Sequence, residues 1–169
     1  ITGDFLPGDV TVEFGGTWQT IRRPYWMPGE IHFTGLEVVN VDLGSGADLG
    51  VRFSYCVQDR AGGIAQALGL AESFVAGECC VVVLGDNIFF GHGLPELMAS
   101  ADARATGATV FGYQVADPQR YGVVDFAADG TVRGIVEKPA VPPSNHAVTG
   151  LYFVDGTAPA KARAVKPSA

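Results

Sequence analysis

Positive charge is scarce in this sequence of 169 residues. It holds 11 Lys and Arg against 18 Asp and Glu, so its formal net charge is −7. Such a chain repels the phosphate backbone of nucleic acids, which argues against DNA or RNA binding as its main task. A small anionic ligand is still compatible with this charge, because local backbone amides and a metal ion can outweigh it.

Long hydrophobic runs are also missing. No apolar stretch approaches the roughly 20 residues that span a bilayer, so neither a transmembrane helix nor a membrane partner is predicted. The first residues, ITGDFLPGDV, contain no basic segment followed by an apolar one, and they predict no signal peptide. They also lack an initiator Met, which indicates a partial chain or an unusual start.

Cysteine is rare, with only Cys56, Cys79 and Cys80. The odd number, and the adjacent pair in an apolar run, predict reduced, buried and structural thiols in a cytoplasmic protein. A zinc site would need more ligands at better spacing. The sequence also has no Gly-x-Gly-x-x-Gly after a strand, which argues against a dinucleotide-dependent oxidoreductase.

The composition changes near residue 44. Residues 1–44 are rich in Gly, Pro and aromatic side chains and show no helical period, whereas residues 45–169 follow an orderly pattern. Hydrophobic residues make up 47% of the chain, which is enough for a core. We therefore predict a divergent N-terminal segment (1–44) followed by one α/β unit (45–169).

The orderly part predicts alternating strands and helices. The run CCVVVL predicts an inner strand of a parallel sheet, covered on both faces. The order of elements predicts a Rossmann-like α/β fold with a mixed, mainly parallel sheet flanked by helices. Strands are expected at 50–58, 79–84, 108–115 and 146–154, helices at 62–75, 94–105 and 158–166, and a hairpin at 121–138 around an Asp-Gly turn.

Asp86 and Asn87 directly follow the apolar run. In open α/β sheets, ligands bind beyond the carboxyl ends of the strands. A carboxylate at that edge suits Mg²⁺, which binds through one or two carboxylates together with substrate phosphates. The alternative interpretation is a capped turn.

Gly62 and Gly63 precede the helix expected at 62–75, where free backbone N–H groups would face a ligand. Gln58, at the end of the preceding strand, offers donor and acceptor groups to the edge of a nucleobase. The alternative is a plain turn from strand to helix.

Two further motifs carry polar groups. In VEKP, Glu137 can accept from sugar hydroxyls and Lys138 can neutralise a phosphate, although an exposed ion pair is the alternative. In AVTGLYF, Thr149 and Gly150 interrupt an apolar strand, which predicts either a close approach of backbone or ligand, or a bulge.

Each of these signals is weak alone, but their order is specific. VQDRAGGIAQAL, VLGDNIFFGHGLPELM, GATVFGYQVADPQRYGVVDF, VEKPAVPPSNHAVTGLYFVD and the terminal KPSA together resemble the glucose-1-phosphate thymidylyltransferase family, from about Gly44 to Ala169. The resemblance implies an incomplete nucleotidyltransferase fold of the GT-A-like type. It also implies a homotetramer that transfers a thymidylyl group from dTTP to α-D-glucose 1-phosphate with Mg²⁺.

The resemblance further implies roles for individual residues. Asp86 and Lys138 would be catalytic, because Asp86 would bind Mg²⁺ and Lys138 would hold the sugar phosphate. Gln58 and Gly63 would contact the thymine. The site for glucose 1-phosphate would comprise Asn87, Gly122, Glu137, Lys138 and Val148, with Tyr121 and Thr149 as neighbours.

The sequence also departs from the family. The Gly-rich phosphate loop LAGGxGTRL is absent, and the chain stops before the family's second metal-binding Asp. Residues 1–44 then suggest a frame-shifted start, with a true alternative segment as the other interpretation. We expect little or no activity from these 169 residues by themselves. The alternative function is a non-catalytic remnant that binds nucleotide or sugar phosphate.

Overall fold

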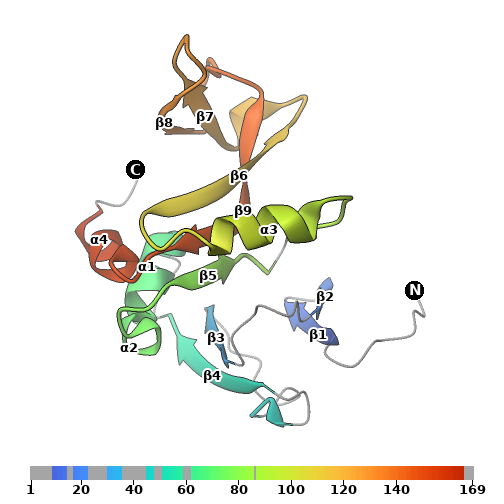
Figure 1. Ribbon diagram of the computed structural model, residues 1–169, viewed down its shortest axis with the longest axis vertical. Coiled ribbons are helices and arrows are strands. Elements are labelled where there is room, and N and C mark those ends of the chain that lie inside the picture. Colours follow the sequence, from blue (N-terminus) through green and yellow to red (C-terminus); the bar gives the residue numbers. More distant parts are fainter. Residues whose placement is uncertain are drawn as a thin grey trace.

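The computed structural model describes residues 45–47, 51–58, 62–85 and 87–165, and the backbone of three earlier strands (Figure 1). Asp86 and the terminal KPSA lie outside the described residues. Of the early strands, β1 (Asp9–Phe14) and β2 (Thr17–Arg22) pair antiparallel. The third, β3 (Glu30–Gly35), pairs in parallel with β4 (Arg52–Val57). A ladder therefore crosses the predicted boundary at residue 44, and the boundary itself stays a prediction.

The orderly pattern after residue 50 folds into the elements that were expected from it. The helix expected at 62–75 is divided in two at Ala71, and a short 3₁₀ helix spans Pro118–Arg120. No described helix combines the length and apolar character needed to cross a membrane. The strands are β5 (Cys80–Val83), β6 (Ala108–Gln114), β7 (Gly122–Phe126), β8 (Val132–Glu137) and β9 (His146–Val154), and the helices are α1 (Gly63–Leu70), α2 (Glu72–Val75), α3 (Leu94–Asp102) and α4 (Ala158–Ala164).

The expectation of a mainly parallel sheet is wrong. Strands β5 to β9 form one sheet in the order β5-β9-β7-β8, with β6 on the other side of β9, and each of its ladders is antiparallel. The parallel ladder of the described part is β3–β4. The physical reason is an insertion: β5 and β6 run in the same direction, but β9 lies between them and takes the hydrogen bonds that parallel neighbours would have shared.

The core lies between α3 and the strands β5, β6 and β9, and Figure 1 shows α3 across these strands. Leu151 and Phe153 of β9 are buried there against Ala101 of α3. Within the described part β5 stands at the end of its sheet, and Val83 is 38% exposed. The expectation of an inner strand covered on both faces is therefore wrong for the described part, where Cys80, Val81 and Val82 are only half-buried and Val83 is exposed.

The cysteines are free, but they are less buried than expected. Cys79 is exposed, and Cys56 and Cys80 are half-buried. The prediction of buried thiols is wrong because Cys79 precedes β5 instead of lying in its ladder, which begins at Cys80.

Asp155 ties the loop before β6 to the start of α4. Its Oδ2 accepts from the backbone N–H of Gly107 at 2.6 Å, and its Oδ1 accepts from the backbone N–H of Thr157 at 2.9 Å and from the Thr157 hydroxyl. Led by the hydroxyl, these donors lower the pKa of Asp155 from 3.8 to about 2. They favour the charged form, so the carboxylate stabilises the folded state.

We predict that Asp155→Asn lowers the melting temperature at neutral pH, because an amide nitrogen cannot accept from Gly107. A depressed pKa stabilises the fold above pH 3.8, and that contribution is lost as the pH falls toward about 2. Thermal melts over this range should therefore show the gap between wild type and variant closing. Asp129→Asn is the matched control, because the bonds that the structure describes for Asp129 stay within its own turn, to Thr131. An equal loss in both variants would contradict the tying role of Asp155.

Candidate functional site

The carboxyl end of β5 is fastened to β9 at Gly150. The backbone N–H of Leu84 donates to the Gly150 carbonyl at 2.8 Å, and the backbone N–H of Gly150 donates to Oδ1 of Asn87 at 2.9 Å. A Cβ at Gly150 would lie 2.7 Å from Cβ of Leu84 and 2.8 Å from Cγ of Asn87. The structure thus confirms the close backbone approach predicted for this strand glycine.

The same contacts position Asn87. Its backbone N–H donates to the Leu84 carbonyl at 3.1 Å, and its side-chain oxygen accepts from Gly150, so Asn87 is held both to the end of β5 and to β9. Asp86, the residue before it in the sequence, lies outside the described residues, so its metal-binding role stays a prediction.

Thr149 has a structural partner. The β6–β9 register shifts between Val110 and Gly112, and the Thr149 hydroxyl donates to the Phe111 carbonyl at 3.0 Å. Such an irregularity leaves an extra residue unpaired in the ladder, and here the hydroxyl satisfies the freed carbonyl. Both alternatives for AVTGLYF are therefore realised, the bulge beside Thr149 and the close approach at Gly150.

The end of the β7–β8 hairpin brings four of the predicted residues together. Gly122 is the register partner of Glu137, and a Cβ at Gly122 would lie 3.2 Å from Oε2 of Glu137. The backbone N–H of Lys138 donates to the Tyr121 carbonyl at 3.0 Å. Nζ of Lys138 lies 3.6 Å from Oε1 of Glu137. The Glu137 carboxylate and the Lys138 ammonium therefore lie next to each other, beside the backbone of Gly122, which carries no side chain.

Lys138 has a strained backbone. Its φ is +42°, in the left-handed region that residues other than glycine rarely adopt. Strain of this kind costs of order 1–3 kcal/mol and persists where the surrounding structure enforces it, often at ligand sites. The side chain is 67% exposed, so its ammonium is accessible to an anion.

Val148 joins the two groups along β9. It pairs with Gly112 of β6, and its neighbour Ala147 pairs with Val123 of β7. Two residues further along, Gly150 contacts Asn87. The residues expected around glucose 1-phosphate therefore lie on adjoining strands, with β9 between the turn after β5 and the end of the hairpin.

Gln58 and Gly63 form a separate pair. Nε2 of Gln58 lies 3.5 Å from the Gly63 carbonyl and 3.3 Å from Oε1 of Gln66. Gly63 begins α1 with a φ of +76°, which glycine adopts at no steric cost. These bonds use the donor of the Gln58 amide, and among the described residues none is recorded for its oxygen. No contact that the structure describes joins this pair to the residues on β7, β8 and β9.

The described residues hold no complete metal site, since no three His, Cys, Asp or Glu side chains among them come close enough to share an ion. The carboxylate that the sequence offers as a metal ligand is Asp86, which lies outside the described residues. Mg²⁺ can be held by one or two carboxylates when substrate phosphates supply further oxygens. A single carboxylate would suit Mg²⁺ only when substrate phosphates supply the other oxygen ligands, so the Mg²⁺ site stays a prediction.

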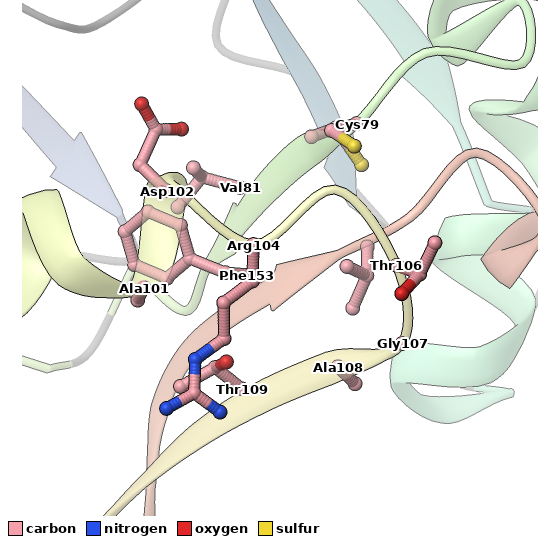
Figure 2. A pocket seen from close by; sticks show the side chains of 12 residues that line it. Cys79, Val81, Ala101, Asp102, Arg104, Thr106, Gly107, Ala108, Thr109 and Phe153 are labelled. Atoms are coloured by element: carbon pink, nitrogen blue, oxygen red, sulfur yellow. The ribbon is translucent and has the colours of Figure 1, made fainter.

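A cavity of about 40 Å³ lies at the opposite edge of the sheet, where β5 and β6 begin. Figure 2 shows side chains that line it, among them Cys79, Arg104 and Thr106. None of the predicted site residues is in its wall. This cavity has no part in the candidate site.

Leu84 is a contributor that sequence reasoning missed. It acts through its backbone N–H, which holds Gly150, just as the Tyr121 carbonyl holds Lys138. Every residue carries such groups, so no side-chain pattern could have marked Leu84. Only the register of the strands brings it to the site.

Comparison with known proteins finds relatives that match the part of the chain containing this candidate site. A family model described as nucleotidyl transferase matches residues 34–169. Curated glucose-1-phosphate thymidylyltransferases are 56% identical over 126 residues in Xanthomonas campestris and 45% identical over 127 residues in Mycobacterium tuberculosis. In both cases the aligned part is 75% of this chain, but only 43% and 44% of the relative.

Solved structures agree with this comparison. A protein assigned as glucose-1-phosphate thymidylyltransferase from Bacillus anthracis, in complex with a sucrose, aligns with a TM-score of 0.66 and 45% identity. The alignment covers 77% of this chain and 52% of that one. An apo UDP-glucose pyrophosphorylase, at 20% identity and a TM-score of 0.66, shares the fold. The chain spans about half the length or less of these thymidylyltransferases, and it belongs to the nucleotidyl transferase family.

Proposed function

We propose that this chain carries the central part of a glucose-1-phosphate thymidylyltransferase. In the proposed reaction a phosphate oxygen of glucose 1-phosphate attacks the α-phosphorus of dTTP in line. A new P–O bond forms, the bond to the β-phosphate breaks, and dTDP-glucose and pyrophosphate result. The observation that carries the proposal is the cluster at the end of the β7–β8 hairpin, where Gly122, Glu137 and Lys138 adjoin.

Each residue of the cluster has a chemical task in this proposal. The Lys138 ammonium would neutralise the sugar phosphate, and the Glu137 carboxylate would accept from glucose hydroxyls. Gly122 leaves room beside Glu137, because even a Cβ there would come within 3.2 Å of the carboxylate. Transfer of phosphoryl-type groups depends mainly on such positioning and charge neutralisation.

The other predicted residues complete the proposed site. The Gln58 amide and the backbone of Gly63 would meet the thymine edge. Asn87, which is bound to β9 through Gly150, and Val148 of the same strand would line the glucose 1-phosphate site. Mg²⁺ would be held by Asp86 and would neutralise phosphate charge. A cytoplasmic location and a homo-oligomer belong to the proposal as well.

A second candidate is a non-catalytic module that binds nucleotide or sugar phosphate. The observation that favours it is the limited span of the match, which reaches only 43–44% of the first two relatives named above. Both candidates require the hairpin cluster to bind glucose 1-phosphate. They differ in whether this segment supports turnover when the remainder of the fold is supplied.

A chimera separates the two candidates. Residues 45–169 would replace the matching segment of the Xanthomonas campestris relative, which is 56% identical. We expect pyrophosphate release that needs both dTTP and glucose 1-phosphate, and a loss of roughly 10²–10³ in rate with Asp86→Asn. The matched control is Asp102→Asn, at the end of α3. A folded chimera that binds both substrates without turnover would favour the non-catalytic module, and one that binds neither would refute both.

A further inference from the structure

Cys79 and Cys80 line one cavity. This space of about 40 Å³ lies where β5 and β6 begin and β9 ends, and Figure 2 labels Cys79 in its wall. Successive side chains within a strand point to opposite faces, which would separate two neighbouring thiols. Cys79 precedes the β5 ladder, which starts at Cys80, so this alternation does not bind it. Both residues border the same cavity and the charge of Cys79 acts on the Cys80 thiol, so the two sulfur atoms are close enough to be considered for one ligand.

The two thiols differ in their exposure to solvent. Cys79 is exposed, and its sulfur makes one weak contact, 3.7 Å from the Ala105 carbonyl. Cys80 is half-buried, and burial, followed by the charge of Cys79, raises the pKa of its thiol. Two neighbouring thiolates repel each other, so one electrophilic centre bonded to both sulfurs would remove that repulsion. An incoming ligand can reach Cys79 first and then close onto Cys80.

The number of ligands limits what could bind. Structural zinc takes four protein ligands, whereas no described group of three His, Cys, Asp or Glu side chains includes this pair. Thiolates prefer soft partners. A suitable partner must be soft, must accept two sulfurs, and must bring its remaining substituent with it. The cavity has room for a few water-sized atoms, so that substituent has to point toward solvent.

We propose that Cys79 and Cys80 form a two-sulfur chelation site for a trivalent arsenic compound, or a metalloid of the same class. Each thiol replaces one hydroxyl group on arsenic. Two As–O bonds break, two As–S bonds form, and two water molecules leave with the thiol protons. Arsenic stays trivalent throughout, so the step needs no oxidant or reductant. The site lies at the opposite end of β5 from Asn87 and belongs to no step of the proposed transfer reaction.

The test is intact-mass measurement of the full chain after treatment with phenylarsine oxide. We expect one phenylarsenic group per chain and the loss of two titratable thiols. The adduct should survive an excess of a monothiol and be removed by a dithiol, which is the signature of chelation by two sulfurs. Cys56→Ser is the matched control, since it removes a half-buried thiol on β4 and should leave the adduct intact.

The variants Cys79→Ser and Cys80→Ser should each lose the monothiol-resistant adduct. Circular dichroism would confirm that they fold, and Cys80→Ala replaces Cys80→Ser if the serine does not. The proposal is overturned if wild type takes up no arsenic, or if the adduct persists in either single variant. Loss of the adduct in Cys56→Ser, or an adduct that links two chains, would overturn it as well.

Discussion

Replacing Gly150 by valine is expected to lower the free energy of unfolding by about 2–4 kcal/mol. A Cβ at this position would lie 2.7 Å from Cβ of Leu84, closer than real Cβ contacts allow, so β5 and β9 would have to separate. Separation also breaks the bonds that join Gly150 to Leu84 and Asn87. Chemical denaturation would measure the loss of stability.

The matched control is the same substitution at Gly134 on β8. A Cβ added there meets no atom within 4 Å, and valine favours extended backbone, so Gly134→Val should leave stability unchanged or slightly raised. In the chimera, Gly150→Val should also reduce turnover, because it breaks the bond that holds Asn87, a residue of the proposed site, to β9. Equal stabilities for the two variants would mean that Leu84 and Asn87 do not approach Gly150 as closely as the structure shows.

The second large effect is expected at Lys138. Hydrogen bonds to charged groups contribute about 1.5–3 kcal/mol, so Lys138→Ala should weaken glucose 1-phosphate binding roughly 10- to 100-fold. Lys138→Gly should weaken it as much, because it removes the same ammonium. The two variants should differ in stability, with glycine more stable than alanine by about 1 kcal/mol, since only glycine relieves the φ of +42°.

Calorimetric titration of glucose 1-phosphate into the chimera and its two variants measures the first effect, and thermal melting of the free proteins measures the second. Wild-type affinity in Lys138→Ala would remove Lys138 from the proposed phosphate site. If the glycine variant is no more stable than the alanine variant, the left-handed backbone is not under strain. The two readouts therefore test the ligand role and the backbone strain independently.

Sequence patterns predicted most helices and strands correctly, because the preferences that form these elements act between residues close together in the chain. The alternation in GVRFSYCVQ, the continuous run CCVVVL and the Asp-Gly turn each act over a few residues, and the structure has β4, β5 and the β7–β8 hairpin there. The helix expected at 62–75 was found as two helices. The prediction of strand direction was wrong, because nothing in β5 or β6 encodes that β9, which begins only at His146, will lie between them.

The sequence alone specified the chemical types at the candidate site: a carboxylate after β5, a Glu–Lys pair at the end of β8, and glycines where backbones meet. Tertiary contacts selected which of these groups adjoin. They brought Gly122, Glu137 and Lys138 together, bound Asn87 to β9 through Gly150, and gave Thr149 a structural partner in Phe111. The physical reason is that side-chain chemistry is local, whereas strand register and backbone hydrogen bonds depend on residues far apart in the chain.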